Sequence, residues 1–293
     1  MTSLVYHATS ITPQSLIAVY ERLGRPASGK VAVKISTGEP GPRGGNWLDA
    51  ALIADFVKLV GGTIVECNTA YEGPRSNAAE HLQVAAEHGF TAIAPVDIMD
   101  ADGTIDLPPP PGGHLSCDIV GAHLADYDFL VILSHFKGHI RGGFGGVLKN
   151  AAIGCASPAG KLYIHSAGTS QTEWTELAAN QDGFLESMAE AATAVADYFG
   201  ERICYINVAN KISVDCDCDG DAAPPSMGDL GVLASLDPVA LDKATVDLVY
   251  AAEDGAEVIE RIESRNGLHA IEWAEKLGLG TQDYELVRID QGP

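Results

Sequence analysis

Residues 31–67 read VAVKISTGEPGPRGGNWLDAALIADFVKLVGGTIVEC, and this stretch decides the predicted fold because it contains a strand, a loop, a helix and a second strand. Residues 31–35 and 63–67 are short runs rich in the β-branched side chains that favour strands. Between them, residues 47–60 have apolar side chains at helical spacing and end at two glycines. Residues 36–46, rich in glycine and proline, form the connecting loop.

The same alternation continues along the chain. A helix is predicted at 78–88, and a strand is predicted at 91–95. Further strands are predicted at 127–134, 203–210 and 230–235, and further helices at 182–200, 238–253 and 268–277. Regular strand–helix alternation is typical of right-handed βαβ units, so we expect an α/β fold with a mainly parallel sheet or sheets and flanking helices.

Residues 100–111 contain four consecutive prolines, which exclude a helix or a central strand. We expect this segment to be a crossing between two closely packed lobes, residues 1–110 and residues 111–293. The second lobe would carry the functional site. One large α/β domain is the alternative for a chain of 293 residues.

The chain has 40 acidic and 18 basic residues, which give a net charge of −22. Such a charge repels nucleic acid and anionic membranes, so neither is an expected partner. A small anionic molecule is the expected partner. Because the chain as a whole is acidic, its binding site must contain a local cluster of basic side chains. No apolar run reaches the roughly 18 residues of a membrane helix, and the first twenty residues lack an export pattern, so we expect a cytoplasmic protein. The sequence predicts no particular oligomeric state.

A basic, glycine-rich loop follows the predicted strand 127–134. The sequence SHFKGHIRGGFGGVLKN, residues 134–150, combines groups for proton transfer with glycines that permit close backbone approach. We assign catalytic roles to His135, His139 and Lys149, and cofactor binding to Lys137, Gly145, Gly146 and again Lys149. A solvated basic turn is the alternative.

Two further loops carry arginines that could hold a carboxylate. Arg43 lies in the loop at 36–46, and Arg75 lies in the loop that follows the strand at 63–67. In an open α/β sheet, ligands bind at the carboxyl ends of strands, so these loops should converge on the basic loop. The alternative is that both arginines pair with the abundant carboxylates.

The six cysteines stand in a chain too long to need disulfides, and none is expected. Thiolates and imidazole together suit zinc, nickel or iron. The candidate metal ligands are His165, Cys155 and the pair Cys216 and Cys218 of the DCDCD segment. A tight acidic turn with incidental thiols is the alternative for that pair.

Six segments resemble the domain of unknown function 362 family. They are TGEPGP at 37–42, NTAYEGPR at 68–75, HLQVAAEHGF at 81–90, the long stretch at 134–161, DCDCD at 215–219 and LASLDPVALDKA at 233–244. Many members carry an inserted ferredoxin unit with two four-iron clusters shortly after the histidine that corresponds to His165. This chain has only a short segment there, so the resemblance does not imply that it carries electrons in that way.

A more distant resemblance is to the nickel-pincer lactate racemases, which have the spacing H-x9-K-x15-H. His139, Lys149 and His165 reproduce it. The resemblance implies that the first histidine is an acid/base, that the lysine carries the pincer nucleotide, and that the later histidine coordinates nickel. The reaction implied is racemisation or epimerisation of a 2-hydroxy acid.

Three functional hypotheses remain open at this point. The first is a metal- or metal-cofactor-dependent enzyme, isomerase- or racemase-like, acting on a small carboxylate. The second is an iron–sulfur redox or cofactor-assembly protein whose [4Fe–4S] cluster is held by Cys155, Cys204, Cys216 and Cys218. The third is a metal-free protein that binds a phosphorylated ligand.

Overall fold

The computed structural model describes residues 2–40, 46–175 and 180–290. Its centre is an eight-stranded sheet in which only one strand, β11, runs opposite to the others. The strands follow the order β12 (Tyr284–Arg288), β1 (Ser3–Ala8), β11 (Gly231–Ser235), β10 (Ile203–Ala209), β7 (Phe129–His135), β2 (Val31–Lys34), β3 (Gly62–Glu66) and β4 (Val96–Ile98). The predicted α/β fold with a mainly parallel sheet is therefore confirmed.

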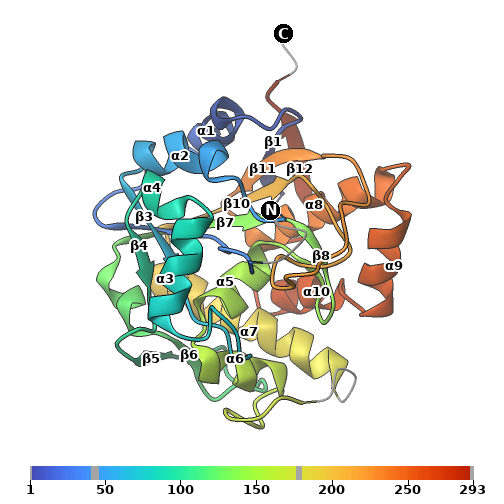
Figure 1. The fold of residues 1–293 in the computed structure, drawn as a ribbon. Coiled ribbons are helices and arrows are strands. Elements are labelled where there is room, and N and C mark those ends of the chain that lie inside the picture. Colours follow the sequence, from blue (N-terminus) through green and yellow to red (C-terminus); the bar gives the residue numbers. More distant parts are fainter. Residues whose placement is uncertain (1, 41–45, 176–179, 291–293) are drawn as a thin grey trace.

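Helices cover both faces of the sheet, as Figure 1 shows. One face and the β3–β4 end pack against α1 (Pro13–Arg22), α2 (Ala50–Leu59), α3 (Ala78–Glu87) and α4 (Phe90–Ile93). The helices on the other side are α5 (Val147–Cys155), α6 (Pro158–His165), α7 (Gln181–Phe199), α8 (Pro238–Ala251), α9 (Ala256–Ser264) and α10 (His269–Lys276).

The central strands divide the core into two clusters. Along β7, Leu130 and Ile132 belong to the cluster beside α5 and α7, while Val131 and Leu133 belong to the cluster beside α1 and α2. Successive side chains of a strand point to opposite faces, so a sheet covered on both sides needs apolar residues at every position. The continuous apolar runs of the sequence have this physical origin.

Both predicted lobes contribute strands to the same sheet, because β2, β3 and β4 precede residue 110 and β7, β10 and β11 follow it. Across the predicted boundary, β5 (Thr104–Leu107) pairs with β6 (Asp118–Gly121), which a 3-10 helix (Ala122–Asp126) follows. The division into two lobes stays a prediction.

The predicted strand at residues 91–95 is wrong. The short helix α4 occupies most of this stretch, and the strand β4 begins only at Val96. Gly89 precedes α4 with a φ of 85°, a left-handed conformation that glycine adopts without strain. A short apolar run fits a buried helix turn as well as a buried strand, so periodicity alone could not separate the two.

The carboxyl ends of β2, β3, β7 and β10 lie at one edge of the sheet. From β2 the chain continues outward through β3 to β4, whereas β7 lies on the other side of β2 and leads to β10. The strand order therefore reverses between β2 and β7. Open α/β sheets bind their ligands beside such a reversal, so this edge is where a site is expected.

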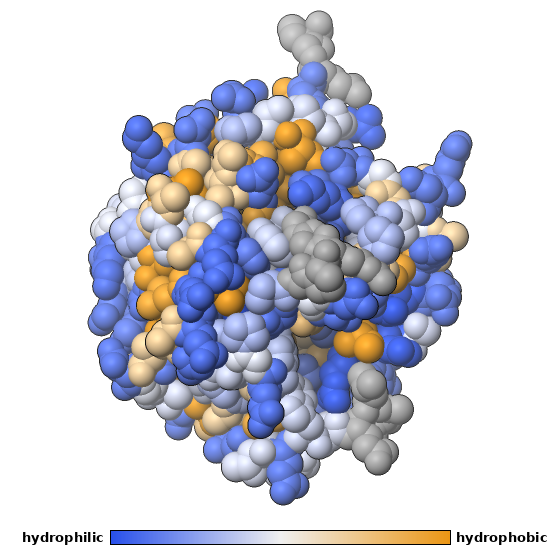
Figure 2. Space-filling model, in the orientation of Figure 1, coloured by the Kyte–Doolittle hydropathy of each residue, from blue (hydrophilic) through white to orange (hydrophobic). Residues whose placement is uncertain are grey.

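Hydrophilic residues dominate the face of the molecule in Figure 2, and apolar residues gather there only in small patches. Among the described residues, no helix combines the length and the apolar character that crossing a bilayer requires.

Candidate functional site

A cavity of about 570 Å³ opens at the predicted edge of the sheet. Its walls come from the segments that follow β2, β3, β7 and β10, together with α5 and α6. Most of the predicted site residues line it: Arg75, His135, Lys137, His139, Gly145, Gly146, Lys149, His165, Cys216 and Cys218. Arg43 lies outside the described residues.

His139 ends β8 (Lys137–His139), the first strand of a hairpin whose second strand is β9 (Gly143–Gly145). Its Nδ1 accepts a hydrogen bond from the Gly142 N–H at 2.8 Å, and burial holds the pKa of His139 well below its usual range. In a neutral imidazole only one nitrogen carries hydrogen. The backbone donor therefore fixes the hydrogen on Nε2, which makes His139 a neutral hydrogen-bond donor.

His165, the last residue of α6, has the opposite tautomer. Its Nδ1 donates to the Lys161 carbonyl oxygen at 2.6 Å, and burial lowers the pKa of His165 to about 3. Nε2 therefore keeps a free lone pair across the physiological pH range. The ring stacks on Phe184 with centroids 4.6 Å apart, which fixes its orientation. A neutral imidazole held through Nδ1 by a backbone carbonyl is the usual form of a metal-ligating histidine.

His135 is also held by a hydrogen bond to the backbone, but only one of its two ring nitrogens has a partner among the described residues. It donates a hydrogen bond to the Asn210 carbonyl oxygen at 2.6 Å, through Nε2, and burial lowers the pKa of His135 to about 4. Nδ1 is buried and accepts no hydrogen bond from any described residue. At neutral pH, His135 is therefore an uncharged side chain with one unused acceptor.

Lys149 is the cavity lysine with the clearest reactive character. Its amine makes no hydrogen bond or ion pair within the described parts of the chain, although the side chain is half-buried. Burial, reinforced by the neighbouring charge of Lys137, lowers the pKa of Lys149 to about 8. More of this amine than of an ordinary lysine is therefore neutral and nucleophilic near neutral pH.

The two predicted cofactor-binding glycines have different surroundings. The N–H groups of Val147 and Leu148, at the start of α5, donate to the Asp242 carboxylate at 2.9 and 3.0 Å. A Cβ on Gly146 would lie 2.2 Å from that carboxylate, so Gly146 is required by internal helix capping. A Cβ on Gly145 would meet only the Lys149 side chain, at 3.5 Å, so Gly145 borders open space.

Arg75 lines the cavity, but most of its donors are engaged. Its Nε donates to Glu39 at 2.8 Å, one terminal nitrogen donates to the Tyr71 hydroxyl at 2.9 Å, and the other lies 3.5 Å from Glu66. The side chain is also buried, with 4% of its surface exposed. This arrangement is the carboxylate pairing that the sequence offered as the alternative to a ligand role.

Two lysines of the wall are likewise ion-paired. Lys34 contacts Glu66 at 2.8 Å, and Lys137 contacts Asp217 at 2.5 Å. Despite the desolvation that would raise it, the charge of Lys34 lowers the pKa of Glu66 to about 2. Lys137 in the same way depresses the pKa of Asp217. Lys137 therefore lines the cavity and at the same time forms an ion pair with Asp217 inside the protein.

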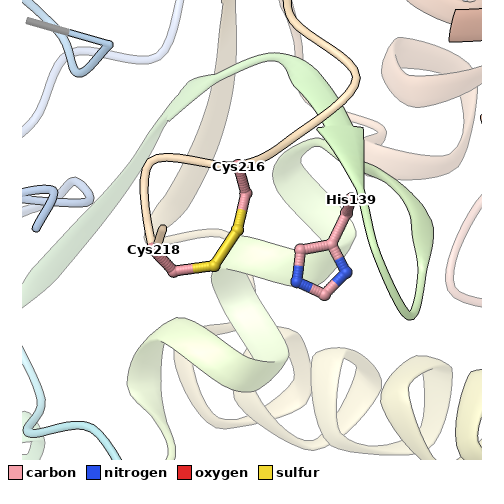
Figure 3. A group of neighbouring side chains, drawn as sticks. All are labelled: His139, Cys216 and Cys218. Carbon is pink, nitrogen blue, oxygen red and sulfur yellow. A yellow bond between two sulfur atoms is a disulfide. The ribbon is translucent and has the colours of Figure 1, made fainter. Parts of the chain in front are cut away.

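Cys216 and Cys218 form a disulfide, with 5.2 Å between their Cα atoms. The expectation that the chain has no disulfide is therefore wrong, because a tight turn brings the two thiols together within the usual Cα separation of a disulfide. The two sulfur atoms and one ring nitrogen of His139 all lie within 4.8 Å of one another. Figure 3 shows a ring nitrogen turned toward the sulfurs.

The other predicted thiol ligands are remote from that group. Cys155 ends α5, is fully buried and does not line the cavity, and burial raises the pKa of its thiol to about 12. Cys204 lies in the core cluster on the opposite face of the sheet. The four thiols of the [4Fe–4S] hypothesis therefore do not form one site among the described residues, and that hypothesis is wrong in this form.

Sequence reasoning missed several residues of the wall. The structure adds Lys34, Lys161, Trp174 and Asp217. Lys34 had a visible signal, because a lysine inside an otherwise apolar strand must be buried with a partner or at a site. Trp174 had none, since its edge contact with the His165 ring, with centroids 5.1 Å apart, depends on how the chain folds back.

Comparison with known proteins identifies a family, and the distantly similar solved structures include the following two. The model of the domain of unknown function DUF362 matches residues 31–247. The lactate racemase apoprotein from Thermoanaerobacterium thermosaccharolyticum is 14% identical, with a TM-score of 0.42 over 73% of this chain and 51% of that chain. A Thermotoga maritima structural-genomics protein is 10% identical, with a TM-score of 0.42 over 92% and 60% of the two chains. The chain thus spans half to three fifths of their lengths. No curated protein matches it in sequence.

Proposed function

We propose that this chain, which belongs to the DUF362 family, is a metal- or metal-cofactor-dependent enzyme that acts on a small carboxylate in the manner of an isomerase or racemase. The observation that carries the proposal is the convergence of His139, Lys149 and His165 on one cavity in three complementary states. They are a neutral donor, an amine and an imidazole lone pair, the last two without a partner among the described residues.

The charges of the wall favour an anionic substrate. Among the described residues, Lys149, Lys161 and Arg141 line the cavity without a carboxylate partner, whereas Lys34 and Lys137 are paired. In a chain with a net charge of −22, unpaired cations held together in a cleft attract a carboxylate locally. Lys149 and Arg141 are the groups we expect to meet it.

The residues fit a metal cofactor at one end of this cavity. His165 offers a fixed Nε2 lone pair, and Lys149 offers an amine able to form a covalent bond with a cofactor. A nickel-pincer group, when bound, supplies the capacity to accept a hydride from a substrate carbon and to return it. The metal is nickel, iron or zinc, because an imidazole ligand suits each of them.

His139 is the hydrogen-bond donor of the proposal. Its Nε2–H would donate to a carbonyl or carboxylate oxygen of the substrate, while the backbone N–H of Gly142 keeps the hydrogen on Nε2. Neutral imidazoles that act as donors in this way occur where burial lowers the histidine pKa. Trp174 and Ile140 line the same cavity and supply apolar surface to it.

The test is anaerobic purification from cells supplied with nickel, iron and zinc, followed by metal analysis and intact mass. We expect a bound metal that His165→Asn loses, because asparagine keeps a donor for the Lys161 carbonyl oxygen but removes the Nε2 ligand. We expect an added mass that Lys149→Met loses, while the exposed Lys58→Met retains it. Single enantiomers of 2-hydroxy carboxylates, followed by chiral chromatography, should be interconverted. Wild-type protein with neither metal nor adduct would contradict the proposal.

A further inference from the structure

The Cys216–Cys218 pair belongs to the cavity wall, and the proposed enzyme assigns it no role. Both cysteines line the cavity, and they are disulfide-bonded. We propose that Cys216 and Cys218 are a redox-active dithiol that exchanges with small disulfides entering the cavity, with His139 as the hydrogen-bond donor to its thiolate. This activity does not depend on whether the cavity holds a metal cofactor.

The tautomer of His139 separates this chemistry from a metal site. His139, Cys216 and Cys218 also satisfy the spacing of a three-ligand metal group. To bind a metal through Nε2, a neutral His139 would have to carry its hydrogen on Nδ1. Nδ1 already accepts from the N–H groups of Gly142 and Arg141, at 2.8 and 3.3 Å, so that hydrogen would face two donors. The ring therefore presents an N–H, not a lone pair, to the sulfurs (Figure 3).

The surroundings of the pair also suit a thiolate. Asp215 and Asp217 flank Cys216, but Asp215 lies 3.2 Å from Arg261 and Asp217 lies 2.5 Å from Lys137. Their negative charges are thus compensated within the protein. A thiolate is stabilised by a nearby donor or cation and becomes the nucleophile for exchange.

Burial distinguishes the two sulfurs. Cys216 is buried, with 3% of its surface exposed, whereas Cys218 is partly exposed. Access decides which thiolate reaches a disulfide in solution. Cys218 is therefore the attacking residue, and Cys216 is the resolving residue.

The exchange balances without a further reactant. The Cys218 thiolate attacks one sulfur of a small disulfide, so that a mixed disulfide forms and one thiolate leaves. The Cys216 thiol then loses its proton, attacks Cys218 Sγ and closes the protein disulfide, while the second small thiol leaves. Overall, two electrons and two protons pass from the protein dithiol to the small disulfide, which becomes two thiols.

The first experiment treats the reduced full-length protein with glutathione disulfide and follows intact mass. We expect wild-type protein to lose two alkylatable thiols without gaining glutathione. Cys216→Ser should retain one glutathione on Cys218, and Cys218→Ser should retain none. Cys117→Ser is the matched control, because Cys117 is partly exposed but burial raises the pKa of its thiol. Equal labelling of Cys216 and Cys218, or labelling of neither, would overturn the proposal.

The second experiment tests the donor with two substitutions of His139. Glutamine keeps an N–H donor near the position of Nε2, and phenylalanine removes it. We expect His139→Phe to slow alkylation of Cys218 at pH 7 roughly tenfold, the effect of one pKa unit on the thiolate fraction, while His139→Gln keeps most of the wild-type rate. Stoichiometric Zn²⁺ binding that both variants abolish would show a metal site and would reject the dithiol. Neither experiment requires a bound metal cofactor. The results therefore test the dithiol separately from the enzyme activity proposed above.

Discussion

The two sides of the cavity treat charge in opposite ways. On the side built from β2 and β3, Lys34, Glu66, Arg75 and Glu39 form a continuous network of ion pairs. On the side built from α5, α6 and the β8–β9 hairpin, polar atoms of His139, Lys149 and His165 face the cavity without side-chain partners among the described residues. The first side resembles a scaffold and the second a reaction centre.

This difference teaches how the two kinds of buried charge should respond to mutation. A paired buried charge stabilises the fold only as long as its partner is present. An unpaired group in a cavity costs stability and persists where function requires it. Substitutions on the two sides should therefore separate stability from activity.

The largest expected effect comes from breaking an ion pair on the side of the cavity built from β2 and β3. Lys34→Met leaves Glu66 buried with one charge partner fewer, and it should lower the free energy of unfolding by about 3–5 kcal/mol. Urea denaturation followed by circular dichroism measures this. Lys34→Met combined with Glu66→Gln should recover part of the loss, and the exposed Lys58→Met should lose almost nothing. A loss below about 1 kcal/mol for Lys34→Met would remove the distinction between the two sides.

A smaller effect should separate two adjacent glycines. Gly146→Ala pushes a methyl group against the Asp242 carboxylate and should cost about 1–3 kcal/mol, as overpacking does. Gly145→Ala meets only the flexible Lys149 side chain and should change stability by less than about 0.5 kcal/mol. Thermal unfolding of both variants under one condition compares them. Equal costs would show that Gly145 is as enclosed as Gly146.

The smallest loss of stability at pH 7 is expected at Lys149, where the effect appears instead as a pH dependence. Its pKa of about 8 in the folded chain lies below the unfolded value, so folding disfavours the protonated amine. Stability should therefore rise between pH 8 and roughly 10.4, where only the unfolded chain holds the proton. Lys149→Met should remove this rise and should not destabilise the protein at pH 7.

Competitive acetylation read by peptide mass measures the titration of Lys149 directly. Half-maximal labelling is expected near pH 8 for Lys149, below the roughly 10.4 of a lysine in a model peptide. A midpoint near the model-peptide value would mean that the Lys149 amine is solvated like a surface lysine.

Much of the fold was predictable because its determinants are local. Apolar runs bounded by glycine at 31–35 and 63–67 correspond to β2 and β3, each within about one residue. The exception was the run at 91–95, where a few apolar residues could not distinguish one helical turn from a strand. The N-terminal strand β1 and the C-terminal strand β12 pair with each other, and no local pattern marked that contact.

The position of the cavity was predictable from glycine and charge in the loops that follow the strands, whereas the state of each group that lines it was not. Arg75 and Lys149 are both cations in such loops or helix starts, and the sequence assigned both to ligand binding. In the structure Arg75 forms an ion pair with Glu39, whereas Lys149 has no partner among the described residues. Partner choice depends on which side chains the βα units bring together, and this is a long-range property.

The sequence by itself determined a parallel α/β sheet and a basic loop at its carboxyl edge, because strand composition, helical spacing and glycine placement act over a few residues. The tertiary structure alone decided the tautomers of His139 and His165, the pKa of Lys149 and the pairing of Cys216 with Cys218. Those properties arise from desolvation and from hydrogen bonds to particular backbone groups, and both exist only after the chain has folded.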